Sequence, residues 1–217
     1  MKMKRIFVLF VFSLLASFAW CEVIAHRHVA FRNGYPEPLH VTKDEADGWR
    51  VAMRNFRQIE GRVVRVSDGD TVTVLDAAKT QHKIRLLDID APESKQAFGQ
   101  KCREHLASFI AGQAVRVTWK EKDQYGRILG TIWVQQFAAK NEGAPSWLNV
   151  NLQMVKDGYA WAYHYTKTPA YLAAMREAKA AKRGLWIDPN AQDPWAFRKA
   201  KRDAQKAKKQ GLLPSHL

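Results

Sequence analysis

Acidic residues and arginines gather in three short stretches of the chain: residues 68–71 (DGDT), 85–93 (RLLDIDAPE) and 123–127 (DQYGR). Carboxylate oxygens can hold a hard divalent cation, and a further carboxylate can activate a water molecule. The planar guanidinium of arginine donates paired hydrogen bonds to phosphate and stabilises the charge that builds on phosphorus. The order and spacing of these residue types therefore favour hydrolysis of a phosphodiester.

Each stretch also has a purely structural interpretation. Asp-Gly-Asp and Asp-x-Tyr-Gly-Arg are typical turns, because Asp and Gly tolerate the backbone angles of a tight turn. A regular strand would place Arg85 on one face and Asp90 on the other. These two side chains can share a pocket only if the chain bends or bulges between them. Pro92 ends the strand and allows Glu93 to turn back.

The hydrophobic pattern predicts the elements that carry these residues. Alternating residues favour strands at 60–67, 71–75 and 82–89, followed by a helix at 98–111 that Gly112 caps. Two more strands, 115–119 and 128–134, flank a turn at Tyr125–Gly126. Helices are expected at 149–156, at 169–183 and through the basic stretch from Trp195 to Gly211. The predicted fold class is α+β, mainly a β barrel: a five-stranded OB-type barrel with flanking helices.

The chain of 217 residues is long enough for one buried core, and its formal net charge is +14. Such a surface attracts polyanions, either nucleic acid or anionic membrane. Residues 26–58 are mixed and polar, and we interpret them as a surface segment that covers a sheet edge. The basic C-terminal helix is most simply a solvated helix, and beside a nucleic-acid site it would add phosphate contacts.

The N-terminus is typical of a secretory signal. Lys2, Lys4 and Arg5 precede an apolar run of 15 residues, which is shorter than the ~20 that span a bilayer. Cleavage after Ala19 predicts an exported protein, periplasmic or secreted, with no stable membrane anchor. An uncleaved anchor is the alternative. A monomer is expected.

The two cysteines are Cys21 and Cys102. Cys102 shares a helical spacing with Phe98 and Leu106, which predicts a buried thiol. A Cys21–Cys102 disulfide is the alternative in an exported protein. Tyr163 and Tyr165 would share one face of an extended segment, either as core residues or as a platform for a base or phosphate.

The ordered set DGDT, RLLxxDxPE, DxYGR, AYxY and RGLW, between residues 61 and 184, resembles the staphylococcal nuclease (thermonuclease) family. The resemblance implies an OB-fold barrel and calcium-dependent hydrolysis of DNA and RNA with little sequence preference. It also implies products with a 3′-phosphate and a 5′-hydroxyl. Residues 186–198 resemble the C-terminal extension of exported bacterial members. The implied organisation is a signal peptide (1–19), an N-terminal extension (20–58), a nuclease domain (59–187) and a basic extension (188–217).

The resemblance also implies roles for individual residues. The calcium ligands would be the carboxylates of Asp70 and Asp90 and the main-chain carbonyl of Ala91, with Mg²⁺ or Mn²⁺ as alternative ions. Glu93 would be the general base, and Arg85 and Arg127 would clamp the phosphate. Tyr125, Tyr163 and Tyr165 would line the nucleotide pocket, and Asp68 would support the metal ligands from behind. Asp88 departs from the family pattern, because the best-known member has an apolar residue there, and we expect it to add a carboxylate behind the metal ligands.

Two other functions compete with a nuclease. A non-catalytic OB domain would keep only nucleic-acid binding, although such domains lose the glutamate or an arginine that this chain retains. An envelope protein would use the basic tail and an uncleaved N-terminus to contact anionic lipid. The first residue of the mature chain tests the envelope-protein alternative, because a start near Trp20 would remove the anchor.

Overall fold

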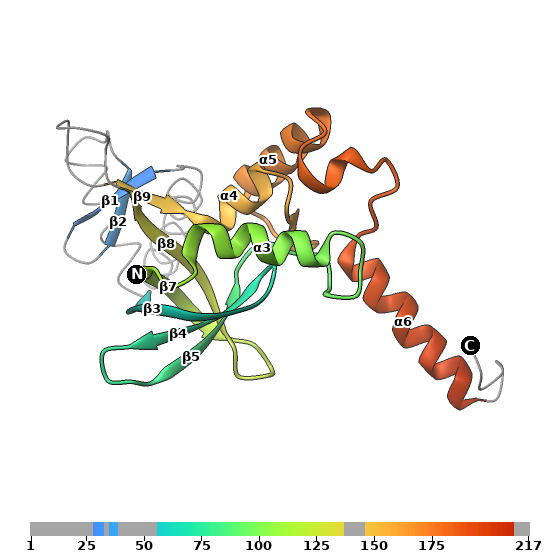
Figure 1. The fold of residues 1–217 in the computed structure, drawn as a ribbon, viewed down its shortest axis with the longest axis horizontal. Coiled ribbons are helices and arrows are strands. Elements are labelled where there is room, and N and C mark those ends of the chain that lie inside the picture. The colour runs from blue at the N-terminus through green and yellow to red at the C-terminus, as the bar shows by residue number, and fades with distance from the viewer. Residues whose placement is uncertain (1–27, 33–34, 39–55, 137–145, 211–217) are drawn as a thin grey trace, which may run out of the picture.

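A computed structural model describes residues 28–32, 35–38, 56–136 and 146–210 of the chain. Five strands form a closed barrel (Figure 1). Antiparallel pairing joins β3 to β4, β4 to β5, β7 to β8 and β3 to β7, while β5 and β8 are parallel and close the ring. The expected OB-type barrel is confirmed. Its strands are β3 (Arg57–Asp68), β4 (Thr71–Asp76), β5 (Gln81–Leu86), β7 (Ala114–Lys122) and β8 (Ile128–Gln136).

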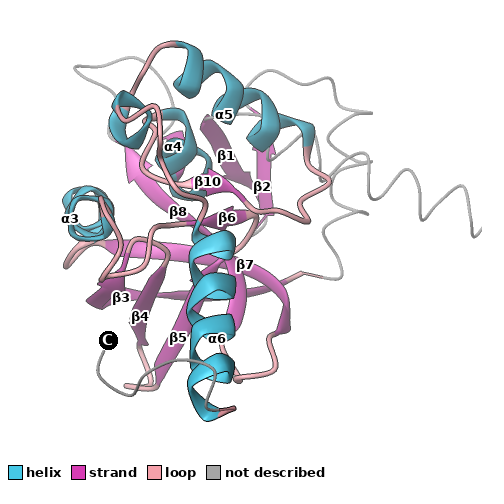
Figure 2. Ribbon diagram, turned by 90° about the vertical axis from the view of Figure 1, so that its right-hand side faces the viewer, coloured by secondary structure: helices cyan, strands magenta, loops and turns pink. Residues whose placement is uncertain are grey.

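Helices cover one end and one side of the barrel (Figure 2). Helix α3 (Gly99–Ile110) follows the third barrel strand as predicted, and Gly112 ends it with a φ of 71°. The remaining helical segments are α4 (Val150–Lys156), α5 (Pro169–Ala180), the 3-10 helix η1 (Gly184–Ile187) and α6 (Pro194–Lys209). Inside the barrel, β-branched side chains from several strands pack to full burial, including Val72, Val74, Ile84, Val117 and Ile132.

Two predicted boundaries were wrong. Helix α5 ends at Ala180 instead of residue 183, because the chain turns through a left-handed Lys182 and reaches the short helix η1 at Gly184. The third strand ends at Leu86, and a separate two-residue strand, β6 (Ile89–Asp90), follows it. The break between β5 and β6 sets the geometry of the site.

The N-terminal extension contributes strands that its mixed composition did not predict. Strand β1 (His28–Arg32) pairs with β2 (Tyr35–Pro38) and with β9 (Ser146–Asn149), which is itself bonded to β8. The extension therefore covers a sheet edge, as expected. Unpaired strand edges invite pairing with other chains, and β1 covers the edge that β9 would otherwise present.

Cys102 is a free, fully buried thiol on α3, beside Leu106 and Ile110. Burial raises the pKa of Cys102 to about 12, so the thiol stays protonated. The predicted buried thiol is confirmed. Cys21, the partner in the alternative disulfide, lies outside the described residues, as does the predicted signal peptide 1–19. No helix in the described part of the chain is long and apolar enough to cross a membrane.

Asn151 of α4 ties three backbone groups together at the end of the barrel. Its Oδ1 accepts from the backbone N–H of Ile132 at 3.0 Å, and its Nδ2 donates to the carbonyls of Leu87 and Gly130, both at 3.0 Å. The side chain is fully buried. It therefore links β8 to the chain that leaves β5 toward the site.

Replacing Asn151 with alanine is expected to lower the free energy of unfolding by about 2–4 kcal/mol, because buried backbone donors and acceptors lose their partners. Urea denaturation followed by circular dichroism measures the change. The exposed Asn190→Ala is the matched control, with an expected change within about 0.5 kcal/mol. Equal unfolding midpoints for the two variants would show that the Asn151 bonds carry little stability.

Candidate active site

A left-handed residue bends the chain between Arg85 and Asp90. Asp88 has a φ of 63°, which interrupts the strand between β5 and β6. Strand β6 then pairs with β10 (Trp161–Ala162), and Asp90 lies opposite Trp161. The bend that strand geometry required for Arg85 and Asp90 to share a pocket is therefore present.

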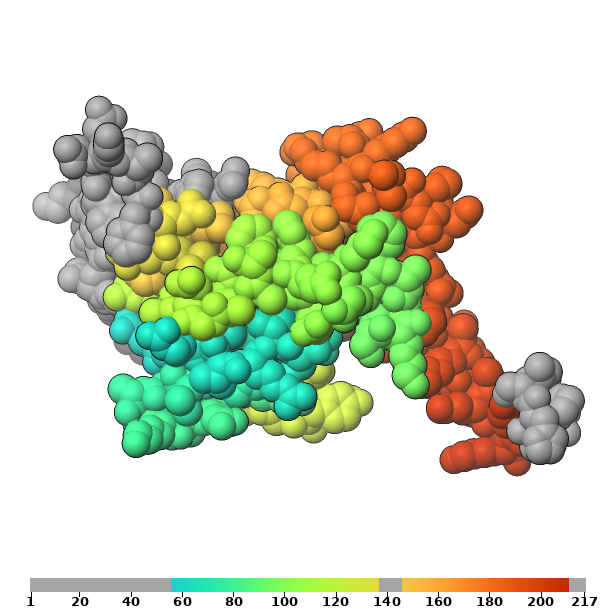
Figure 3. All heavy atoms as spheres, in the orientation of Figure 1, coloured from blue at the N-terminus to red at the C-terminus, as the bar shows by residue number. Residues whose placement is uncertain are grey.

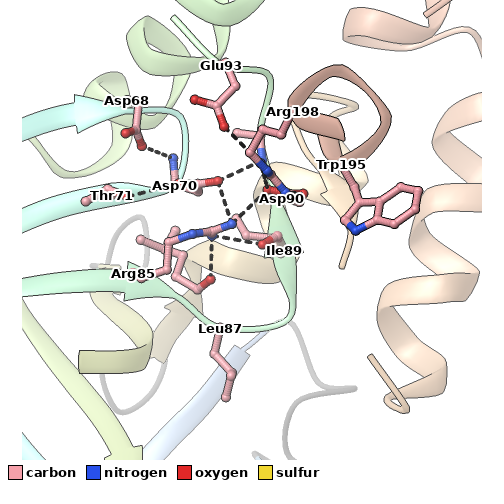
Figure 4. Close-up of polar contacts among 12 residues, drawn as sticks. Asp68, Asp70, Thr71, Arg85, Leu87, Ile89, Asp90, Glu93, Trp195 and Arg198 are labelled. Carbon is pink, nitrogen blue, oxygen red and sulfur yellow. Dashed lines mark hydrogen bonds and ion pairs between the residues drawn. The ribbon is translucent and has the colours of Figure 1, made fainter. Parts of the chain in front are cut away.

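Arg85 joins the two carboxylates that were predicted to be metal ligands (Figure 4). Its Nη2 lies 3.0 Å from Asp70 Oδ2 and 2.9 Å from Asp90 Oδ1. Its Nη1 donates to the carbonyls of Leu86 and Ile89, at 3.0 and 2.9 Å. The guanidinium thus spans the bend and is fixed on both sides of it. Because Asp70 and Asp90 contact the same nitrogen, their carboxylates face a common point.

Asp70 is held at the start of β4 by the DGDT turn. Its backbone N–H donates to Asp68 Oδ1 at 3.1 Å, and its own Oδ2 accepts from the backbone N–H of Ala91 at 2.9 Å. A side chain at Gly69 would lie only 2.7 Å from the Cβ of Ala91, so glycine is required for this close approach. Burial is the main cause that raises the pKa of Asp70 to about 6, against the opposing effect of Arg85.

Glu93 is positioned by a turn in the loop before α3. The backbone N–H of Glu93 donates to Gln96 Oε1 at 3.2 Å, and the N–H of Gln96 donates back to the Glu93 carbonyl at 2.8 Å. Gln96 also donates to the carbonyl of Gln192 at 2.5 Å. A Cβ at Gly99 would lie 2.0 Å from the Glu93 carbonyl oxygen, so the start of α3 passes directly against this loop. The Glu93 side chain is 43% exposed and reaches solvent.

Arg127 lies across the cavity on the turn between β7 and β8. Asp123 fixes it, accepting from its Nε at 2.7 Å and from its backbone N–H at 2.9 Å. The ring of Tyr125 lies 5.5 Å from its guanidinium carbon and is 74% exposed. Within the described residues, no hydrogen bond engages the terminal nitrogens of Arg127, which leaves them able to donate to a bound anion.

The two downstream tyrosines lie on a turn and not on the extended segment that was predicted. Their rings still contact each other edge to face, with centroids 5.7 Å apart. Tyr163 donates its backbone N–H to the Asp88 carbonyl at 2.8 Å and lines the cavity. Tyr165 is 64% exposed and lies outside the cavity lining, so core packing does not explain it.

Asp88 does not support the other site carboxylates directly. Its carboxylate accepts from the hydroxyls of Thr166 and Thr168, at 2.7 and 3.2 Å. These bonds hold the segment that carries Tyr163 and Tyr165 against the bend. The left-handed backbone directs this carboxylate toward the start of α5, and support of the metal ligands by Asp88 stays a prediction.

Replacing Asp88 with asparagine is therefore expected to keep activity and to keep or raise the stability at pH 7. Burial raises the pKa of Asp88, so the ionised carboxylate costs stability in the folded chain. That cost is absent at acidic pH and appears as the pH rises through the raised pKa. Asparagine can accept from one threonine hydroxyl through Oδ1 and donate to the other through Nδ2, so both contacts persist without charge. It also tolerates the positive φ.

Thermal denaturation at pH 4 and pH 7 measures the effect, and Asp88→Ala is the comparison. The alanine variant loses both threonine bonds and is expected to be about 1–3 kcal/mol less stable than wild type. The stabilising difference between Asp88→Asn and wild type should shrink as the pH falls. A loss of activity in the asparagine variant as large as in the alanine variant would mean that the site needs the Asp88 charge.

Arg198 of α6 contacts the site and was not predicted to do so. Its Nη2 lies 2.6 Å from Asp90 Oδ2, and its Nη1 donates to Asp90 Oδ1 at 3.1 Å and to Glu93 Oε1 at 2.9 Å. Nearby, the rings of Trp195 and His164 stack with centroids 5.3 Å apart. The sequence offered two signals here, the cluster of arginine and lysine in residues 195–209 and the family resemblance of residues 186–198, and neither assigned a site role to Arg198.

One cavity of about 710 Å³ collects these groups. All the predicted site residues line it except Asp90 and Tyr165, and three residues of α6, Trp195, Arg198 and Arg202, add to its wall. Asp90 is only 2% exposed because the guanidinium groups of Arg85 and Arg198 cover it. The cavity therefore combines acidic groups that can bind a cation and activate water with arginines that can bind a phosphate.

Comparison with known proteins identifies the class to which this barrel and cavity belong. Residues 83–188 match the family model described as staphylococcal nuclease homologue. The chain is 44% identical over 158 residues to a micrococcal nuclease of Shigella flexneri, an alignment that covers 71% of this chain and 88% of that protein. It is 43% identical over 152 residues to protein ParB of Escherichia coli, covering 69% and 84%. It is also 44% identical over 144 residues to an uncharacterized endonuclease of E. coli, covering 66% and 87%.

The chain therefore belongs to the staphylococcal nuclease family. As a member of that family it is a nuclease, an enzyme of the hydrolase class.

Proposed function

We propose that the protein hydrolyses phosphodiester bonds of DNA and RNA with little sequence preference, using calcium. The observation that carries the proposal is the bridge from Arg85 to both Asp70 and Asp90, beside Glu93 and in a cavity shared with Arg127. Cation ligands, a base and two phosphate-binding donors are thereby available to one substrate group.

The donor set suits a hard cation. Asp70 and Asp90 offer only oxygen, are nearly buried and lie close together because both contact the Arg85 guanidinium, and the Ala91 carbonyl belongs to the adjoining residue. Among the described residues, no three His, Cys, Asp or Glu side chains are grouped closely enough to hold a metal ion alone. An ion there would therefore need oxygens of the substrate and of water. This is ordinary for calcium, which takes six to eight oxygen ligands, and argues against a zinc site.

A bound cation would neutralise the negative charge on a phosphate oxygen and help to orient the attacking water. The rest of the chemistry falls to this chain. Glu93, with its exposed carboxylate at the cavity, would take a proton from that water, a contribution typically of ~10²–10⁴-fold in rate. Arg85 and Arg127 would donate hydrogen bonds to the phosphate oxygens as charge increases on them, each worth a few kcal/mol in a site that excludes water.

The aromatic residues at the rim suit a nucleotide. Tyr125 beside Arg127 and Tyr163 beside the bend offer ring faces and hydroxyls on two sides of the cavity. Stacking on aromatic rings tolerates any base, which fits a substrate range that covers both DNA and RNA. Tyr165 would extend this surface outside the cavity through its contact with Tyr163.

Export and a monomeric state complete the proposal. Export rests on the charged and apolar pattern of residues 1–20, which predicts cleavage after Ala19 and release from the membrane. Mass spectrometry of the protein recovered outside the cytoplasm should give a first residue near Trp20. An intact N-terminus in the membrane fraction would support the anchored alternative.

The experiment that tests the activity is digestion of single-stranded DNA, double-stranded DNA and RNA by residues 20–217. Each substrate is incubated with calcium, magnesium, manganese or a chelator, and the ends of the products are identified. We expect cleavage of all three substrates with calcium, products with a 3′-phosphate, and no cleavage with the chelator. Tight, salt-sensitive binding without cleavage under every condition would instead identify a nucleic-acid-binding module.

A further inference from the structure

The first turns of α6 place Arg198 in contact with two carboxylates of the proposed site, those of Asp90 and Glu93. Arg198 makes a two-pronged contact with Asp90 and a third bond with Glu93 (Figure 4). An arginine that only kept a surface helix soluble would have no reason to reach a carboxylate that is 2% exposed. Arg198 is therefore part of the site, and its role depends on what else those carboxylates must bind.

The oxygens of Asp90 have little capacity left for another partner. A carboxylate oxygen offers about two acceptor positions. Asp90 Oδ1 accepts from Arg85 Nη2 at 2.9 Å and from Arg198 Nη1 at 3.1 Å, and Oδ2 accepts from Arg198 Nη2 at 2.6 Å. These three bonds leave about one acceptor position, on Oδ2 beside the Arg198 guanidinium. A cation bound there would be repelled by that guanidinium and would therefore compete with it.

Arg198 is the guanidinium that can move. Arg85 has a side chain that is 13% exposed and is held by Asp70, Asp90 and two backbone carbonyls. The side chain of Arg198 is 31% exposed, and among the described residues it bonds only to the two carboxylates. It also lies near the start of a helix whose far end projects from the body (Figure 3), and residues 199–206 of that helix are exposed.

A displaced Arg198 would stay beside the substrate. Trp195, Arg198 and Arg202 lie on one face of α6 and form part of the cavity wall. A turn of the long arginine side chain away from Asp90 would therefore point the guanidinium into the cavity that Arg85 and Arg127 also line. Arginine pairs with phosphate as readily as with carboxylate and in the same two-pronged geometry. A positive ion on Asp90 would repel Arg198, while a phosphate in the cavity would attract it.

We propose that Arg198 and the divalent cation bind Asp90 alternately, and that cation binding transfers the Arg198 guanidinium from Asp90 and Glu93 to the substrate phosphate. Arg198 would then be a third substrate-binding arginine, supplied by the C-terminal extension. The second half of this proposal rests on the proposed function, since it needs a nucleic-acid substrate. The first half, competition with the cation, does not require any catalytic activity.

Isothermal titration with calcium, without nucleic acid, tests the competition in residues 20–217. Arg198→Gln removes the competing charge, and Arg198→Lys keeps the charge but loses the two-pronged guanidinium contact. Lys206→Gln is the control on the exposed part of the same helix. Bonds to charged groups contribute ~1.5–3 kcal/mol, so Arg198→Gln should bind calcium about 10-fold more tightly or better. Arg198→Lys should be intermediate and Lys206→Gln close to wild type. Equal or weaker binding in Arg198→Gln would overturn the competition.

Binding of a single-stranded phosphorothioate oligonucleotide, followed by fluorescence anisotropy at saturating calcium, tests the transfer. Loss of one phosphate contact should weaken binding by Arg198→Gln about 10-fold, while Lys206→Gln should lose no more than about 3-fold. Equal losses in both variants would overturn the transfer. A wild-type protein that binds calcium and DNA in this way but cleaves nothing would overturn the proposed nuclease activity and not the role of Arg198.

Discussion

Replacement of Arg85 with lysine is expected to lower kcat/KM for DNA by at least about 100-fold while the barrel remains folded. Arg85 uses two nitrogens for four partners, namely Asp70, Asp90 and the carbonyls of Leu86 and Ile89. Lysine has one ammonium group and cannot reproduce this geometry or a two-pronged phosphate contact. The loss of one positioned donor to a transition-state oxygen typically costs ~10²–10³ in kcat.

Initial rates on a labelled oligonucleotide, beside far-ultraviolet circular dichroism and a melting curve, measure the effect of Arg85→Lys. The control is Arg65→Lys, which makes the same change on the exposed face of β3 and should leave the rate within about 2-fold. Wild-type turnover in folded Arg85→Lys would remove Arg85 from the reaction. An unfolded variant would instead show that its four bonds are needed for the fold.

Replacement of Glu93 with glutamine is expected to lower kcat about 10²–10⁴-fold, which is the usual contribution of a general base. Substrate binding should persist, because Arg85, Arg127 and the tyrosines are untouched. The amide oxygen of glutamine can still accept from Arg198, so the variant removes the basic group with little change of contacts. The rate loss should therefore appear in kcat more than in KM.

Single-turnover rates and equilibrium binding of the same oligonucleotide separate these two effects. Glu121→Gln, an exposed position on β7, is the matched control and should behave like wild type. A variant Glu93→Gln that loses binding but keeps its turnover rate at saturating DNA would assign Glu93 to substrate recognition and leave the base unidentified.

The barrel could be predicted because β3, β4 and β5 alternate between polar and apolar or β-branched residues and because turns with Asp or Gly separate the paired strands. The bend at Asp88 was harder to predict, since a left-handed residue other than glycine is uncommon. Strand geometry nevertheless showed where a bend was needed, because Arg85 and Asp90 could not otherwise share a pocket. The motif thus carried information about the backbone as well as about the chemistry.

The contacts that the sequence did not reveal join residues far apart in the chain. Arg198 lies 108 residues from Asp90, and Thr168 lies 80 residues from Asp88. Nothing in the local pattern distinguishes Arg198 from the other cations of α6, because its role depends on where the connection after η1 directs the helix. The hydrogen bond from the Gln96 side chain to the Gln192 carbonyl helps to place α6, and no local sequence pattern predicts it either.

The most direct test of the central claim is cleavage and binding of one single-stranded DNA by wild type and by Glu93→Gln, with calcium and with a chelator. The proposed site predicts that wild type cleaves only with calcium and that Glu93→Gln binds the DNA with near wild-type affinity but leaves it intact. Calcium-dependent cleavage at the same rate by both proteins would contradict the site described here. It would place the reacting groups elsewhere in the chain.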